Sequence, residues 1–206
     1  MLILRYLPHR FVDATLETLD LVQFPFVAGY VDDITCREGK NMSLFKDGCG
    51  LLLSGPPGVG KTWALAALSR FYLEYTESKG EPFDCAFVTA PVFFSRYDNP
   101  VEVLWDSYRG MSFTDVYNHV PWLVLNDLGK EYRGGKLEEQ VPYKLGRLLR
   151  TRSEAERVTH ITTNLSLSGN GDGTIRGVYG ESIASLLAEM TKAFEVTGPD
   201  RRRGAQ

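Results

Sequence analysis

The sequence predicts an α/β domain built on a parallel β-sheet, and two observations support this fold class. Short apolar runs alternate with longer segments in which apolar residues recur at helical spacing, the pattern of strands joined by crossover helices. A glycine-rich turn, GPPGVGKT at residues 55–62, lies directly between one apolar run and a long helical pattern. The 206 residues suffice for one domain with a sizeable core. We therefore expect a single domain over residues 1–206, with residues 1–12 as an N-terminal arm and residues 199–206 as a basic C-terminal tail.

The first half of the chain is expected to hold two helices and two strands. Asp13 is a good N-cap residue and favours a helix at its own position and beyond, whereas the polar stretch before the first strand favours a loop. Apolar runs mark the strands, and wide apolar coverage ended by Gly80 marks the second helix. The expected elements are helix 13–22, loop 33–49, strand 50–54, helix 61–78 and strand 85–89.

The second half of the chain continues the alternation of helices and strands. A fully apolar run indicates a strand buried on both faces, and leucines at helical spacing indicate the long helix that follows it, although Pro142 and Gly146 weaken that pattern. A segment rich in Gly, Ser and Asn indicates a loop. The expected elements are helices 101–108 and 113–119, strand 122–125, helix 137–152, strand 159–163, loop 165–180, helix 183–194 and strand 194–197.

The stretch GPPGVGKT matches every fixed position of the phosphate-binding pattern G-x-x-x-x-G-K-[ST]. Gly58 and Gly60 can adopt positive φ, so that successive N–H groups turn inward as a nest for phosphate oxygens. The helix that follows adds the partial positive charge of its N-terminus. We expect Lys61 to reach the β- and γ-phosphates and the Thr62 hydroxyl to bind Mg²⁺. The expected nucleotide-binding residues are Gly55, Pro56, Pro57, Gly58, Val59, Gly60, Lys61 and Thr62.

Two further polar positions follow apolar strands. Asp127 comes just after the run 122–125 and is expected to hold Mg²⁺, partly through water, and to orient an attacking water. Asn164 ends the strand 159–163 and is expected to sense the γ-phosphate. Either residue taken alone is also an ordinary turn signal.

Composition excludes several classes of protein. Hydrophobic residues make up 43% and charged residues 24% of the chain, and the net charge is −3, so any binding of nucleic acid must depend on a local patch. The apolar runs are too short to predict a transmembrane helix, and no membrane partner is expected. Three widely spaced cysteines, Cys36, Cys49 and Cys85, are interpreted as reduced thiols of a cytoplasmic protein.

Taken together, these segments resemble the AAA+ ATPase domain of the DnaC/DnaI helicase loaders and of their relative, the IstB transposition helper. The resemblance covers nearly the whole chain. Its matching segments are Leu7-Pro8-His9-Arg10-Phe11, Ala14-Thr15-Leu16, Gly50-Leu51-Leu52-Leu53-Ser54, GPPGVGKT, Leu123 to Gly129, Arg152, Thr162-Thr163-Asn164-Leu165, Tyr179-Gly180-Glu181 and Gly198-Pro199-Asp200-Arg201-Arg202.

The resemblance implies a five-stranded parallel sheet of order 5-1-4-3-2 and the cofactors ATP and Mg²⁺. It implies catalytic roles for Lys61, Asp127 and Asn164, and it makes Arg202 the closing arginine of the nucleotide site. The implied function is a phage-encoded or mobile-element helicase loader with ATPase activity. Its expected partners are a replicative helicase, single-stranded DNA and further copies of itself. The alternatives are an IstB-like transposition helper, a nucleotide-binding switch with little hydrolysis, and a small-molecule P-loop kinase.

The chain departs from the family pattern at three places. Asn126 replaces the first acidic residue of the family's D-D-L-G segment, and only Asp127 remains. Leu186 stands where an arginine usually reaches the γ-phosphate of a neighbouring subunit, and Arg176 is the nearest upstream substitute. Few residues precede the ATPase core, where such loaders often carry a helicase-gripping domain. We therefore expect slow ATP hydrolysis.

A basic segment is the candidate surface for single-stranded DNA. Lys144 and Arg147 are one helical turn apart and are expected to share a face. The aromatic residues before this segment could stack bases, or they could be core while the charges form a solvated face. The basic residues are Lys130, Arg133, Lys136, Lys144, Arg147, Arg150 and Arg152, and the aromatic residues are Trp105, Tyr108, Phe113 and Tyr117.

Overall fold

The computed structural model describes residues 8–35, 48–80, 84–97, 110–131 and 136–203. Their centre is a five-stranded parallel sheet of order β2-β3-β4-β1-β5. Read from the other edge, this is the predicted order 5-1-4-3-2, which is thereby confirmed. The strands are β1 (Gly50–Ser54), β2 (Cys85–Thr89), β3 (Trp122–Leu128), β4 (Val158–Thr163) and β5 (Thr191–Glu195).

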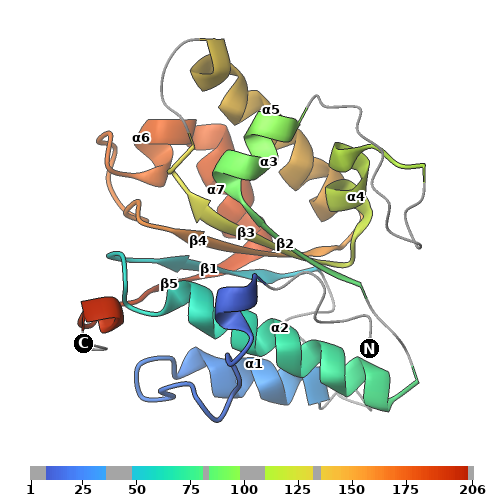
Figure 1. Ribbon diagram of the computed structural model, residues 1–206. Helices are drawn as coiled ribbons and strands as arrows, with labels where there is room; N and C mark the ends of the chain where they lie inside the picture. Colours follow the sequence, from blue (N-terminus) through green and yellow to red (C-terminus); the bar gives the residue numbers. More distant parts are fainter. Residues whose placement is uncertain (1–7, 36–47, 81–83, 98–109, 132–135, 204–206) are drawn as a thin grey trace.

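Helices cover both faces of the sheet, as Figure 1 shows. On one face lie α1 (Phe26–Thr35) and α2 (Lys61–Ser78). On the other face lie α3 (Ala90–Arg96), α4 (Phe113–His119), α5 (Lys136–Glu154), α6 (Ile175–Tyr179) and α7 (Glu181–Met190). Because every strand is parallel, all carboxyl ends of the strands meet at one edge, where ligands bind in folds of this class.

The alternation of side chains along β1 divides the core into two layers. Leu51 and Leu53 pack among residues of α1 and α2, whereas Leu52 packs in the cluster that includes side chains of α3, α4, α5 and α7. Successive side chains of a strand point to opposite faces, so a wholly apolar strand can serve both layers. The P-loop therefore follows a strand that is buried along its whole length.

Several predicted elements are confirmed. β1, α2, β2 and α4 have the predicted bounds. β3 continues three residues beyond the predicted run, β4 begins one residue earlier, and α5 spans the predicted helix despite Pro142. The predicted helix 101–108 and most of the predicted loop 33–49 lie outside the described residues.

The predicted helix over residues 13–22 is wrong, because this segment is a series of turns. Thr15 and Thr18 each accept a hydrogen bond from the other's backbone N–H, at 3.3 and 3.0 Å. The Asp20 carboxylate accepts the N–H of Val22 at 3.1 Å. Short polar side chains of this kind compete with the hydrogen bonds of a helix, so they replace it here.

Three helices were missed by the sequence analysis. α1 places Val27, Tyr30 and Ile34 on its buried face, a spacing partly masked by its polar C-terminal end. α3 carries Pro91 in its first turn, where proline is tolerated although it reads as a breaker. α6 lies inside the predicted loop 165–180, capped by the Thr174 side chain.

The last helix and strand are shifted from their predicted bounds. β5 begins at Thr191 because its five residues pair in register with the five residues of β1.

Among the described residues, each helix is too short or too polar to span a membrane.

Candidate nucleotide-binding site

The glycine-rich turn after β1 has the backbone that a phosphate nest requires. Gly55, Gly58 and Gly60 all have positive φ, of 138°, 84° and 97°. Gly60 is also the N-cap of α2, so the N-terminus of an 18-residue helix faces this turn. A side chain at Gly58 would clash, because its Cβ would lie 1.8 Å from Oδ1 of Asp200. The backbone N–H groups and the helix dipole together favour an anion here.

Lys61, the first residue of α2, is held by three oxygen atoms. Its Nζ donates to the carbonyls of Gly55 and Pro56, at 2.7 and 2.8 Å, and to Oδ1 of Asn164 at 3.0 Å. Burial lowers the pKa of Lys61 to about 8, and the charges of Lys130 and Arg202 act in the same direction against that of Asp127. The ammonium is thus placed beside the nest at a high electrostatic cost that an anion would relieve.

Asn126, near the end of β3, connects the start of α2 with β4. Its Oδ1 accepts the hydroxyl of Thr62 at 2.6 Å and the hydroxyl of Thr162 at 2.8 Å. Asn126 is wholly buried, and its Nδ2 has no hydrogen-bond partner. The group beside the Thr62 hydroxyl is therefore the side-chain amide of Asn126. The sequence analysis did not predict this contact.

Asp127 adopts a conformation that is rare for a residue with a side chain, with φ of 62°. Its N–H donates to the Thr162 hydroxyl at 2.9 Å, and its carboxylate pairs with Lys130 at 2.8 Å. The pairing of β3 with β4 shifts register between Leu125 and Leu128. Backbone strain of this kind often accompanies functional sites.

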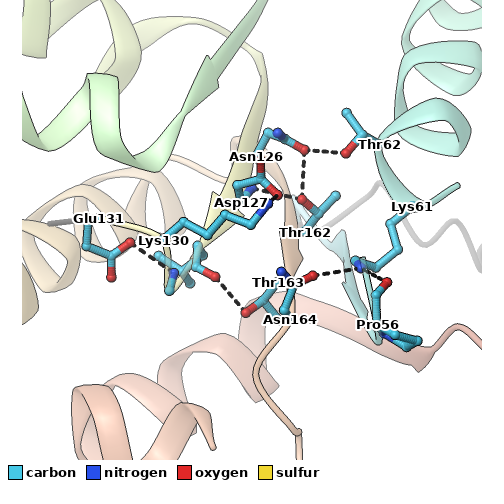
Figure 2. A network of polar contacts seen from close by, with 12 residues as sticks. Pro56, Lys61, Thr62, Asn126, Asp127, Lys130, Glu131, Thr162, Thr163 and Asn164 are labelled. Atoms are coloured by element: carbon cyan, nitrogen blue, oxygen red, sulfur yellow. Dashed lines mark hydrogen bonds and ion pairs between the residues drawn. The ribbon is translucent and has the colours of Figure 1, made fainter. Parts of the chain in front are cut away.

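Figure 2 shows how three segments meet at this edge of the sheet. Lys61 and Thr62 come from the start of α2, Asn126 and Asp127 from the end of β3, and Asn164 from the end of β4. The structure thus brings together the three residues predicted to be catalytic. Thr163 points its hydroxyl to the carbonyl of Leu128 at 2.7 Å and accepts the N–H of Leu165 at 3.0 Å, which fixes the turn that carries Asn164.

The C-terminal turn closes the site from the side of the P-loop. The N–H of Arg201 donates to the carbonyl of Gly58 at 3.0 Å, and its guanidinium pairs with Asp20 at 2.9 Å. Arg202 pairs with Asp200 at 3.1 Å. Arg202, predicted to be the closing arginine, therefore lies at the candidate site, and Arg201 anchors the turn that brings it there.

A cavity of about 550 Å³ connects these groups. Its polar lining includes Lys61, Thr62, Asp127, Asn164 and Arg202. Its lining also includes the aromatic residues Phe11, Phe24 and Trp63. A cavity that combines anion-binding groups with aromatic side chains suits a phosphorylated ligand that carries a planar base.

Several residues of the predicted DNA surface are buried. Lys144 is buried and its Nζ lies 5.1 Å from the ring centre of Tyr97, so it does not share an exposed face with Arg147. Phe113 and Tyr117 belong to the hydrophobic core. Arg147 and Arg150 are exposed on α5, whereas the side chains of Trp105, Tyr108, Arg133 and Lys136 lie outside what the structure describes.

Arg152 has a structural place rather than one in the nucleotide site. It is wholly buried. Its guanidinium donates to the carbonyls of Tyr117, Val120 and Val158, each at 2.7 Å, and to the hydroxyl of Thr159 at 2.7 Å. It therefore ties the end of α4 to the start of β4.

The sheet order and the glycine-rich turn between β1 and α2 match the AAA+-type P-loop NTPase fold. No known protein-family profile matches the chain, and no curated protein matches it in sequence. Solved structures do match. DnaI is 21% identical with a TM-score of 0.64, over 96% of this chain and 95% of that one. The DnaC helicase loader is 24% identical with a TM-score of 0.65, over 92% of this chain and 100% of that one.

The replication initiator DnaA, bound to AMPPCP and single-stranded DNA, is a more distant match. It is 14% identical with a TM-score of 0.57, over 93% of this chain and 52% of that one. At these identities the comparisons establish the fold, which agrees with the resemblance drawn from the sequence motifs.

Proposed function

We propose that this protein is an ATP-binding and ATP-hydrolysing helicase loader that acts in DNA replication. The observation that carries the proposal is the meeting of Lys61, Asn164 and Arg202, from three distant segments, around one phosphate-binding turn. The similar folds of DnaI and of the DnaC helicase loader support the choice of partner, a replicative helicase. The DnaA structure supports single-stranded DNA as a second ligand.

The residues of the site have distinct roles in this proposal. The nest and Lys61 hold the phosphates. Asn164 contacts Lys61 and can transmit the presence of a phosphate to the end of β4. Among the described residues, Asp127 contributes the one carboxylate that lines the cavity. This carboxylate can orient an attacking water and can accept a proton from it. Arg202 adds positive charge beside the phosphates.

A nucleotide-binding switch with little hydrolysis is the second candidate. Leu186 is partly buried against the core and cannot serve as a trans-acting arginine. Arg176, the nearest substitute, pairs with Glu181 at 2.6 Å. An arginine supplied from a neighbouring subunit is worth about 10³–10⁵ in rate. ATP turnover measured with and without single-stranded DNA and helicase separates the two candidates.

The proposal is tested by capture of the replicative helicase encoded by the same genome. We expect the tagged protein to retain the helicase with ATP and to release it with ADP, because the nucleotide state biases one conformation. Lys61→Ala should not retain it, whereas Lys192→Ala, an exposed change on β5, should behave as wild type. Failure to retain the helicase in every nucleotide state would contradict the loader assignment.

A further inference from the structure

The residue next to the Thr62 hydroxyl is neutral, whereas a magnesium site usually has a carboxylate there. Mg²⁺ is usually bound through one or two carboxylates together with the phosphates of the nucleotide. Here the position is filled by Asn126, which is neutral. Both lone pairs of its Oδ1 are used, by Thr62 at 2.6 Å and by Thr162 at 2.8 Å. A carbonyl oxygen has two such lone pairs, so none remains for a metal-bound water, and Nδ2 is a donor that cannot face a cation.

Asp127 does not replace the carboxylate that is missing at position 126. Its carboxylate is the one acidic group that lines the described part of the cavity, and it is already paired with Lys130 at 2.8 Å. Lys130 would repel a metal ion placed at this carboxylate. The predicted set of Thr62 and Asp127 therefore fits a tightly held Mg²⁺ badly.

Three cationic side chains line the same cavity as the glycine-rich turn. They are Lys61, Lys130 and Arg202. The Lys130 side chain remains 45% exposed, so its ammonium can turn from Asp127 to a phosphate oxygen.

We propose that Lys130, with Lys61 and Arg202, neutralises the nucleotide phosphates in place of a tightly held Mg²⁺, so that nucleotide affinity is nearly independent of this ion. This inference rests on the proposed nucleotide-binding function and adds a phosphate ligand that no motif contains. Asn126 makes nucleotide affinity nearly independent of Mg²⁺, because a carboxylate at position 126 would repel the phosphates unless a metal ion lay between them.

Titration calorimetry with the non-hydrolysable analogue AMPPCP, in Mg²⁺ and in EDTA, tests the inference. For the wild type we expect dissociation constants that agree within about threefold in the two buffers, far less than a charge-assisted contact contributes. Asn126→Asp should bind at least about tenfold more weakly in EDTA than in Mg²⁺, the ratio of one charge-assisted contact. Lys130→Ala should weaken binding in EDTA by a similar factor, and Lys192→Ala should not.

The outcomes separate this inference from the function on which it rests. A wild type whose affinity falls about tenfold or more in EDTA overturns the inference but leaves nucleotide binding intact. An unchanged affinity of Lys130→Ala in EDTA also overturns it. Absence of AMPPCP binding in both buffers, from a sample whose circular dichroism shows a folded α/β domain, overturns the proposed function itself. The wild-type comparison decides even if Asn126→Asp fails to fold.

Discussion

The Nζ of Lys61 lies 3.0 Å from Oδ1 of Asn164, although the two residues are 103 positions apart. Lys61 begins α2 beside the phosphate nest, and Asn164 follows β4. A phosphate in the nest would compete with Asn164 for the ammonium, since Lys61 has three donor hydrogens and already makes three contacts. In the proposed function, this one hydrogen bond therefore links nucleotide binding to the position of the turn after β4.

Lys61→Ala should weaken ATP binding at least about tenfold, because a charge-assisted contact to phosphate contributes about 1.5–3 kcal/mol. The fold should survive, since the lysine contacts two turn carbonyls and the Asn164 side chain rather than the hydrophobic core. Titration calorimetry measures the affinity, and Lys192→Ala is the matched control. An unchanged affinity would remove the basis of the phosphate-site assignment.

ATP affinity should fall as the pH rises above 8. Burial lowers the pKa of Lys61 to about 8, and a phosphate beside it raises that pKa again. The bound state therefore holds a proton that the free state loses above pH 8, and affinity declines by up to about tenfold per pH unit above that value. Calorimetry in two buffers of different ionisation enthalpy should show proton uptake at pH 8.5, and Lys61→Ala should abolish it. Affinity that does not change from pH 7 to 9 would contradict this reading.

Asp127→Asn should abolish ATP turnover while leaving nucleotide affinity within about threefold, because an amide keeps a contact with Lys130 but cannot accept a proton. Asn126→Ala should act mainly on stability, since it leaves two hydroxyls without their acceptor, at about 1–3 kcal/mol. Phosphate release and urea unfolding distinguish the two effects. Wild-type turnover in both variants would place the reacting groups elsewhere.

Arg152→Ala should lower the free energy of unfolding by at least about 3 kcal/mol, because several buried carbonyls lose a charged donor at once. Arg152→Lys should be intermediate, as it keeps the charge but not the forked geometry. Urea unfolding measures the loss, and ATP affinity of the folded fraction should stay unchanged. Lost ATP binding at unaltered stability would instead assign Arg152 to the nucleotide site.

The parts of the fold that could be predicted are those set by a local pattern. β1 and α2 follow from an apolar run, a glycine-rich turn and a long helical period. The turns of residues 13–22 could not be predicted, because reciprocal bonds of Thr15 and Thr18 outweigh the apolar spacing. The start of β5 depends on its register with β1, which no local sequence feature records.

In the candidate site too, some features follow from a local sequence pattern and others depend on tertiary packing. Lys61 and Thr62 come from a contiguous motif, whereas the contact between Thr62 and Asn126 depends on how β3 and β4 sit beside α2. Lys144 was predicted to lie on an exposed face because its polarity alone was considered. It lies on a helix packed between α4 and α7, so its ammonium faces Tyr97 rather than solvent.

The combined change Arg147→Glu and Arg150→Glu should weaken binding of single-stranded DNA without altering ATP affinity. Both side chains are exposed, and they lie one helical turn apart on α5. If each contacts one phosphate, the slope of log affinity against log salt should become less steep by about 0.7 per lost contact. Fluorescence anisotropy with a labelled oligonucleotide, read with and without ATP, measures both quantities. The combined change Lys79→Glu and Lys192→Glu alters net charge equally at exposed positions outside α5, and it should leave the slope unchanged. Equal weakening by both pairs would mean that only net charge matters, and α5 would then not be a DNA-binding surface.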